Sequence, residues 1–354
     1  MDADVKILAP DALRQFESLR TDAVAVVTER FYAAHGSAYA DAGARGRESC
    51  REDIAYHLEF LHPVLEFGYL RPMVDYLRWL ASVLAARFVP VEHIALSLDL
   101  LAAFFAEHMN ATDGAAVSAA LRAARTQFLE AKSALPLSCH EPWPEAEPFG
   151  SALLAGQQHK ALSIMNQCID TGHSLLEVEQ YVIKPALYQI GEGWQTNQVT
   201  VASEHLATAI AQSVMTVGLL RSPPPETVGK RVLLACVAGN EHAVGLRMVA
   251  DAFQLAGWDA HYLGANAPTL AIVRHAEEWK PDLIGLSVSF AQQLRSANQV
   301  IRQLGERLGS SRPAVIIGGL AINRFDRLAE MVGADAFSPD APSAVTAASQ
   351  LVSG

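Results

Sequence analysis

The sequence of 354 residues lacks several features that mark specialised classes of protein. It contains no run of eighteen or more apolar residues, which argues against a membrane-spanning helix. Its beginning has neither the basic nor the apolar stretch of a secretory signal peptide, so we expect a cytoplasmic protein. Lysine and arginine total 27 against 38 acidic residues, and this net charge of -11 disfavours non-specific DNA binding.

Cysteine is also scarce. The four cysteines, Cys50, Cys139, Cys168 and Cys236, show no CxxC or other metal-ligand spacing, so we expect free thiols in a reducing compartment. Hydrophobic residues make up 51% of the chain, which is enough to form a core in each of two or three domains.

Apolar periodicity predicts an α + α/β protein with three regions. Apolar residues recur three and four positions apart through residues 1–134, which predicts an all-helical domain. The prolines of PLSCHEPWPEAEPFG predict a linker at 135–147, and the helical stretch at 148–220 has the length of a four-helix bundle. In 229–354, apolar runs such as RVLLACVA, DLIGLSVS and AVIIGGL alternate with helical patterns. This alternation predicts a flavodoxin-like, Rossmann-type parallel sheet covered by helices on both faces.

The first strand-to-helix loop of the predicted sheet carries Asn240, Glu241 and His242 between Gly239 and Gly245. In a doubly wound sheet this loop lies at the edge where ligands bind, and the glycines allow a large ligand to approach the main chain. A lone histidine is usually a solvated or internally satisfied side chain. Its place in this loop favours a binding role instead.

Residues 229–354 contain several short motifs in the same order as in one known protein family. The family carries Asp-x-His-x-x-Gly, then Ser-x-Leu, then a Gly-Gly pair, and a second strand and loop similar to GWDAHYLGANAP, which contains Gly264. The matching segments here are Asn240-Glu241-His242-Ala243-Val244-Gly245, Ser287-Val288-Ser289 and Gly318-Gly319. This region resembles the cobalamin-binding domain shared by methionine synthase, corrinoid methyl carriers, adenosylcobalamin mutases and cobalamin photoreceptors.

The resemblance implies a cobalamin cofactor with His242 as the lower axial ligand of cobalt. It also implies that the nucleotide tail of the cofactor lies in a channel lined by Ser287, Ser289, Gly318 and Gly319, the glycines leaving room for it. The alternative is that these glycines only form turns. Two residues depart from the family pattern. Asn240 replaces an acid that would accept a hydrogen bond from the imidazole, so a weaker cobalt–histidine bond is expected. Ser289 replaces leucine, which leaves the channel roomier.

The end of the second helical region carries Trp194, nine residues, and then Glu204-His205. This spacing resembles the helical cap of the CarH-type adenosylcobalamin photoreceptors. The resemblance implies that Trp194, Val201 and Glu204 pack around the adenosyl group, and that His205 binds the upper face of cobalt after photolysis. The alternative is a core tryptophan and a solvated helix face.

The N-terminal region lacks the basic recognition helix of a DNA reader, so DNA binding is not expected. A helical domain fused to a cobalamin photosensor resembles the photocobilins, which implies biliverdin as a second chromophore. Cys50 lacks surroundings that would activate its thiol for covalent attachment. The alternative is that the apolar side chains are core and the arginines are solvated. The candidate bilin-binding residues are His57, His62, Arg51, Tyr56, Tyr69, Arg71 and Arg78.

These features predict a light-responsive cobalamin sensor that is not itself an enzyme. We expect a homo-oligomer whose assembly or partner contacts change with light, and the sequence does not identify the downstream partner. The alternative is a corrinoid methyl carrier of a methyltransferase system, which also places a helical bundle before a cobalamin domain. A bulky Trp194 with Glu204 suits an adenosyl group better than a methyl group. A mutase is excluded because the pattern contains no barrel domain.

Overall fold

The structure is a computed structural model that describes residues 5–37, 39, 43–130, 141–325 and 327–352. The chain divides into two compact units, Met1–Leu135 and Pro136–Gly354. No helix within the described ranges is both long and apolar enough to cross a membrane.

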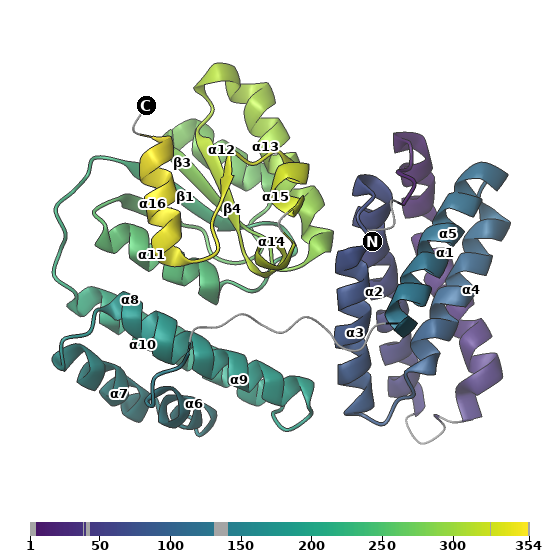
Figure 1. Ribbon diagram of the computed structural model, residues 1–354, viewed down its shortest axis with the longest axis horizontal. Helices are drawn as coiled ribbons and strands as arrows, with labels where there is room; N and C mark the ends of the chain where they lie inside the picture. The colour runs from purple at the N-terminus through teal and green to yellow at the C-terminus, as the bar shows by residue number, and fades with distance from the viewer. Residues whose placement is uncertain (1–4, 38, 40–42, 131–140, 326, 353–354) are drawn as a thin grey trace. The chain divides into compact units, whose positions relative to one another are not determined.

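The first unit is helical, which confirms the prediction from periodicity (Figure 1). Helix α4 packs against α5, and α1 packs against α2 and α4. Phe16 and Phe105 lie fully buried between these helices, with ring centroids 5.0 Å apart. The helices in its described part are α1 (Pro10–His35), α2 (Gly43–Phe67), α3 (Arg71–Ala85), α4 (Glu92–His108) and α5 (Ala111–Glu130).

The second unit begins with the predicted four-helix bundle. Its third helix is a continuous run of two α-helical segments joined by a π-helical turn. The side chain of Thr200 caps the fourth helix by accepting a hydrogen bond of 3.1 Å from the main-chain N–H of Ser203. The segments are α6 (Ala146–Leu154), α7 (Gln158–Asp170), α8 (Leu175–Val178), η2 (Glu179–Ile183), α9 (Lys184–Gln195) and α10 (Val201–Arg221).

The proline-rich stretch before the bundle is shorter than predicted. Helix α6 begins at Ala146, so the expectation of a linker through residue 147 is wrong at its C-terminal end. Pro148 is tolerated because it lies in the first turn, where a main-chain N–H has no partner within the helix. Trp143 anchors the preceding residues, since its main-chain N–H donates to the oxygen of Tyr181 at 3.0 Å and the two rings stack.

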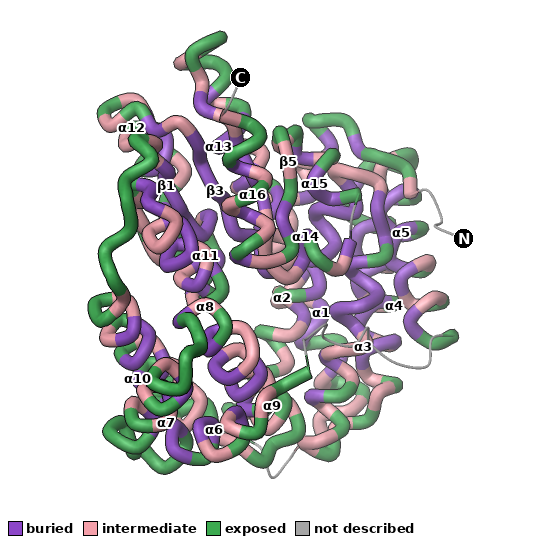
Figure 2. The backbone as a smooth tube through the Cα atoms, turned by 60° about the vertical axis from the view of Figure 1, so that its left-hand side comes forward, coloured by how far each residue is buried: buried purple, intermediate pink, exposed green. Residues whose placement is uncertain are grey.

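The rest of the second unit is a parallel sheet in the order β2-β1-β3-β4-β5, the flavodoxin-like order that the sequence predicts (Figure 1). Figure 2 shows β1 and β3 buried along their length, as expected for strands covered on both faces. The strands are β1 (Arg231–Cys236), β2 (Asp259–Tyr262), β3 (Leu283–Ser287), β4 (Ala314–Gly318) and β5 (Ala336–Phe337).

Helices cover this sheet. Helices α11 and α16 pack together over the face formed by Val232, Leu234 and Cys236, and α12 packs against α13. The segments are α11 (Val244–Leu255), α12 (Thr269–Trp279), η3 (Ala291–Gln293), α13 (Leu294–Leu308), η4 (Gly309–Ser311), α14 (Leu320–Arg324), α15 (Arg327–Val332) and α16 (Ala341–Leu351).

The register of the sheet aligns the ends of its three central strands. Cys236 pairs with Ser287, and Ser287 pairs with Gly318. The loops that follow β1, β3 and β4 therefore leave the sheet side by side at one edge. The bundle shares a core with the sheet region, because Met248 and Ala252 of α11 lie in the same apolar cluster as the bundle residues.

Candidate functional site

The loop after β1 is held in place by a buried amide. Asn240 has no exposed surface. Its side-chain nitrogen donates to the main-chain oxygen of Ser287 at 2.9 Å, and its side-chain oxygen accepts from the main-chain N–H of His242 at 3.1 Å. The acceptor that we expected to face the imidazole is thus directed at the main chain. Asn240 therefore fixes the course of the loop that presents His242.

Two further polar side chains, which the motifs did not indicate, secure the same loop. Asn266, in the loop after β2, accepts from the N–H of Gly239 at 2.8 Å. Gln293 donates to the oxygen of Gly239 at 2.9 Å and accepts from the N–H of Ser289 at 2.8 Å. The available sequence signal was their position after the carboxyl ends of neighbouring strands, but spacing alone does not show which main-chain groups they reach. Together they link the loops after β1, β2 and β3.

His242 follows in this loop and is exposed. Its ring meets the ring of Phe290 edge to face, with centroids 5.1 Å apart. Although part of its surface is exposed, nearby protein displaces much of the water around the ring, and this desolvation lowers the pKa of His242 against the charges of Glu204 and Glu241. A lowered pKa favours the neutral imidazole, the form that ligates transition metals.

Helix α10 packs against α11, the helix that follows this loop, and the charge of Glu204 at its start acts on His242. The carboxylate of Glu204 accepts a hydrogen bond of 2.9 Å from the hydroxyl of Thr208 and also pairs with the ring of His205. Val201, at the beginning of the same helix, is 52% exposed. The start of α10 thus carries a carboxylate whose charge acts on His242, together with an imidazole and an exposed apolar side chain. Trp194 lies in α9, before the turn that leads into α10, and is half-buried.

The two glycines at the end of β4, Gly318 and Gly319, are required by the fold itself. Gly319 has a φ of +103°, and a Cβ there would lie 2.4 Å from the main-chain oxygen of Val288. A Cβ at Gly318 would lie 2.9 Å from the oxygen of Ser338. Neighbouring main chain therefore lies where side chains would project at both positions, so the fold itself requires glycine there. The lining of a tail channel by Gly318 and Gly319 stays a prediction. The backbone in this region approaches too closely for any larger residue.

The other residues expected at this edge divide into buried and open positions. Ser287 and Ser289 are 6% and 7% exposed, at the end of β3 and just after it. Gly264 follows β2 with a φ of +77°. A Cβ at Gly245 would have no atom within 4 Å, so the surface above the start of α11 is open. The serines remain predicted channel residues, and the open surface suits a large ligand.

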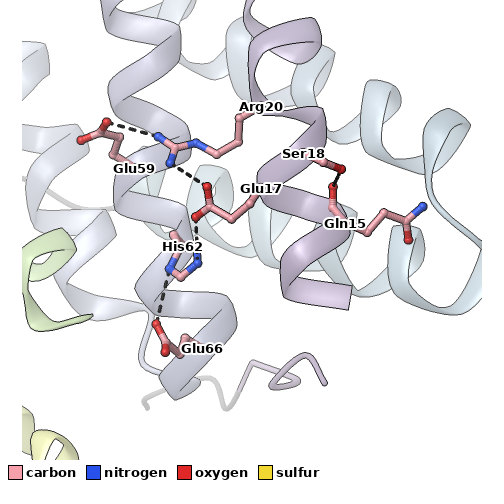
Figure 3. A network of polar contacts seen from close by, with 7 residues as sticks. All are labelled: Gln15, Glu17, Ser18, Arg20, Glu59, His62 and Glu66. Atoms are coloured by element: carbon pink, nitrogen blue, oxygen red, sulfur yellow. Dashed lines mark hydrogen bonds and ion pairs between the residues drawn. The ribbon is translucent and has the colours of Figure 1, made fainter. Parts of the chain in front are cut away.

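The predicted bilin-binding histidines of the first unit are engaged within the protein. His57 is 2% exposed and shares a hydrogen bond of 3.0 Å with the hydroxyl of Tyr76. Burial lowers the pKa of His57 to about 3. Figure 3 shows His62 between two carboxylates, 3.0 Å from Glu17 and 3.5 Å from Glu66. Both imidazoles thus contribute to the packing of the helices.

The remaining candidates of the first unit differ widely in exposure. Tyr69 is 5% exposed and Tyr56 is 51% exposed. Arg51 and Arg71 are exposed, and Arg78 is half-buried. Burial and then the charge of Asp53 raise the pKa of the Cys50 thiol to about 11, so this thiol is not activated. Cys139 lies outside the described residues.

A cluster of rings that the sequence did not indicate lies elsewhere in this unit. The ring of His93 lies 5.1 Å from that of His35 and 5.2 Å from that of Phe31. The hydroxyl of Tyr39 contacts Nδ1 of His93, and Arg47 lies over the ring of Tyr32. These residues come from α1, α2, α4 and the α1–α2 connection, so their meeting depends on the tertiary fold. We name them the aromatic cluster.

Comparison with known proteins places two family matches on the second unit. Residues 230–348 match a family model described as a B12 binding domain. Residues 146–217 match a second model with the same description. The first match covers the sheet region with His242, and the second covers the bundle with Glu204.

Three curated relatives share part of this chain. The HTH-type transcriptional repressors CarA and CarH of Myxococcus xanthus are 31% identical over 44% of the chain and 26% identical over 59% of it. These matches span 52% of CarA, about half its length, and 70% of CarH. Dimethylamine corrinoid protein 3 of Methanosarcina acetivorans is 30% identical over 40% of this chain and 68% of its own length.

A solved structure supports the fold. The monomethylamine corrinoid protein of Methanosarcina barkeri superposes with a TM-score of 0.50 at 17% sequence identity. The match covers 58% of this chain and 96% of that one. At this identity the likeness concerns the fold alone, a helical bundle followed by a parallel sheet.

Proposed function

This chain belongs to the B12-binding family, and from that premise we propose that it is a light-responsive sensor that carries adenosylcobalamin. Cobalamin binding suits the residues present. His242 is exposed on a loop fixed by Asn240, its neutral form is favoured, and the surface above Gly245 is open. His242 would hold the metal from below, and Ser287 and Ser289 would face the tail.

The observation that carries the sensor proposal is the packing of α10 against α11 in one apolar core. The Glu204-His205 pair lies at the start of α10, and the loop that would hold the metal directly precedes α11. The effect of the Glu204 charge on the pKa of His242 supports the nearness of the two groups. When bound, adenosylcobalamin supplies a cobalt–carbon bond that visible light breaks. Val201, Trp194 and Glu204 would hold the adenosyl group, and His205 would be the upper ligand after light. Loss of the group they hold would free the bundle to change its contacts with a second copy of the chain or a partner.

The test compares the full chain loaded with adenosylcobalamin in the dark and after green light. Free adenosylcobalamin also reacts with light, so the deciding measurements are the molecular mass of the assembly and the ligands of the photoproduct. We expect both to change on illumination. His205→Ala should leave the dark spectrum unchanged and alter the photoproduct spectrum, whereas Glu192→Gln, an exposed position in α9, should behave like the parent. The sensor would be rejected if illumination left the molecular mass of the assembly unchanged and if the photoproduct spectrum were the same in the parent and in His205→Ala.

A second candidate function is that of a corrinoid methyl carrier. It is favoured by the similarity to dimethylamine corrinoid protein 3, whose identity to this chain is comparable to that of CarA. The match also covers a larger share of that protein's own length, 68% against 52% for CarA. A carrier needs no bulky group between the bundle and His242. Trp194→Ala would therefore leave cobalamin affinity unchanged for a carrier, and would selectively weaken adenosylcobalamin relative to methylcobalamin for a sensor.

Biliverdin as a second chromophore in the first unit is a further part of the proposal. Because His57 and His62 have partners inside the unit, we propose the aromatic cluster as a second candidate site for the bilin. Its rings supply aromatic surface, and Arg47, which pairs with Glu29, would have to exchange that partner for a carboxylate of the tetrapyrrole. Biliverdin added to the full chain should produce a shifted red absorption band that His93→Ala reduces and exposed His159→Ala does not. No shifted band would reject bilin binding.

A further inference from the structure

Two buried carboxyl groups face each other where the bundle meets the sheet region. Glu179, the first residue of the π-helical turn, is 1% exposed, and Asp251 of α11 is 0% exposed. Arg247 donates from Nε to Oδ1 of Asp251 at 2.7 Å. Neither oxygen of Glu179, nor Oδ2 of Asp251, has a hydrogen-bond donor among the described residues. Buried carboxylate oxygens without a donor are costly, so this arrangement requires an explanation.

A shared proton provides the missing hydrogen bond. Two carboxylates can only accept, whereas a protonated Glu179 can donate to Asp251. The cluster then contains one positive charge on Arg247, one negative charge on Asp251 and a neutral Glu179, so its net charge is zero. Loss of the proton would leave a net negative charge in a buried position.

The charges that face these groups agree with that assignment. Burial, followed by the charge of Asp251 and the hydrogen bond to it, raises the pKa of Glu179 well above its usual range, and Arg247 opposes this shift. Burial also raises the pKa of Asp251, against the hydrogen bond and charge of Arg247 and the hydrogen bond from Glu179. Tyr262 of β2 also faces Asp251, and burial raises the pKa of its hydroxyl to about 12, which keeps it neutral.

The cluster lies at the interface between the bundle and α11. Val178 and Val182, on either side of Glu179 in the bundle, share an apolar core with Met248 and Ala252 of α11. Helix α11 begins at Val244, directly after the loop that carries the proposed cobalt ligand. The interface that contains the carboxyl pair therefore connects the bundle to the helix that follows the cofactor loop.

We propose that Glu179, Asp251 and Arg247 form a proton-dependent latch that holds the bundle against the sheet region and releases one proton when the two separate. In the open state Glu179 is solvated and ionises at an ordinary pKa, whereas in the closed state it keeps its proton. The closed state therefore binds more protons, so closure is favoured at low pH and weakened as the pH rises. Between the two pKa values the opening equilibrium should increase up to about tenfold per pH unit. This property does not depend on light sensing.

The experiment uses the full chain loaded with cobalamin and kept in the dark. Hydrogen exchange of the α11 and η2 amides, corrected for the intrinsic effect of pH, gives the opening equilibrium between about pH 5 and pH 9. We expect opening to increase with pH in the parent chain. Glu179→Gln retains a donor to Asp251 but cannot ionise, so its opening should be independent of pH and lower than that of the parent at high pH. Glu192→Gln, at an exposed position of the same helical run, should keep the parental dependence.

Infrared spectroscopy provides a second measurement on the same proteins. A protonated carboxyl group gives a carbonyl stretch that is distinct from that of a carboxylate. The parent and Glu192→Gln should show this band at neutral pH, and Glu179→Gln should lack it. A parental spectrum in Glu179→Gln, or the same pH slope of exchange in both proteins, would overturn the latch.

Discussion

The side-chain amide of Asn240 and the main-chain oxygen of Ser287 are joined by a hydrogen bond of 2.9 Å in a fully buried position. The bond connects the loop after β1 to the last residue of β3, although the two are far apart in sequence. The same side chain accepts from the N–H of His242 at 3.1 Å. A single amide thus uses both its donor and its acceptor to set the position from which His242 is presented.

Replacement of Asn240 should therefore destabilise the sheet region. Asn240→Ala leaves the His242 N–H without its acceptor and the Ser287 oxygen with only the N–H of Val237, at a cost of about 1–3 kcal/mol in the free energy of unfolding. Asn240→Asp restores the acceptor but not the donor, and places a carboxylate against the Ser287 oxygen, so it should also destabilise. Urea unfolding followed by circular dichroism measures both changes. An unchanged midpoint in both variants would contradict this role.

A pair of glycine substitutions should have opposite effects on stability. Gly319→Ala places a Cβ 2.4 Å from the oxygen of Val288 at a φ of +103°, which should cost about 1–3 kcal/mol or more. Gly305 lies within α13, where a Cβ would have no atom within 4 Å. Gly305→Ala should therefore stabilise by about 0.5–1 kcal/mol. Thermal unfolding of the two variants decides the matter, and a stabilising Gly319→Ala would refute the close approach of the strand ends.

Removal of the Glu204 charge should change the titration of His242. Glu204 opposes the lowering of the His242 pKa, so Glu204→Gln should shift this pKa further down. The neutral imidazole, which can ligate a metal, would then persist to lower pH than in the parent. Nuclear magnetic resonance titration of the His242 ring in the cofactor-free chain measures the shift, with Glu192→Gln as the control. An identical titration in Glu204→Gln and the parent would show that the start of α10 does not face the ring.

The buried imidazole of His57 should make the first unit sensitive to acid. The pKa of His57 is lowered from 6.5 to about 3, so between these values the unfolded chain binds the additional proton. The free energy of unfolding should therefore fall as the pH falls through this window. His57→Gln can still bond to Tyr76 but does not titrate, so it should flatten the dependence. Hydrogen exchange in α2 and α3 measures it, with exposed His108→Gln retaining the parental slope. A parental slope in His57→Gln would rule out His57 as the cause.

Much of the fold follows from short stretches of sequence. The runs RVLLACVA, DLIGLSVS and AVIIGGL predict buried parallel strands, because they are short, nearly continuous in apolar residues and alternate with helical patterns. The alternation of these runs with helical patterns predicts the order of the sheet, and the sheet places His242 at its carboxyl edge. The predicted linker was too long at its C-terminal end, because α6 already begins at Ala146 and the following Pro148 is compatible with the first turn of a helix.

The contacts of individual side chains could not be predicted as well from the sequence. Asn240 was expected to face an imidazole, and the structure directs it to the main chain. Gln293 carried no motif, and the hydrogen bond of His57, a candidate for bilin binding, to Tyr76 in the core was not predicted. In each case the partner is set by how two elements pack, which spacing along one segment does not report.

The sequence by itself determined the helical regions, the parallel sheet and the loop that carries His242, because hydrophobic periodicity and glycine-flanked loops act over a few neighbouring residues. Only the tertiary structure decided that the charge of Glu204 acts on His242 and that Glu179 meets Asp251. The two residues of each pair are far apart in the sequence, and they come together because the bundle packs on α11. The charge and desolvation that each group experiences arise from that packing and from no local pattern.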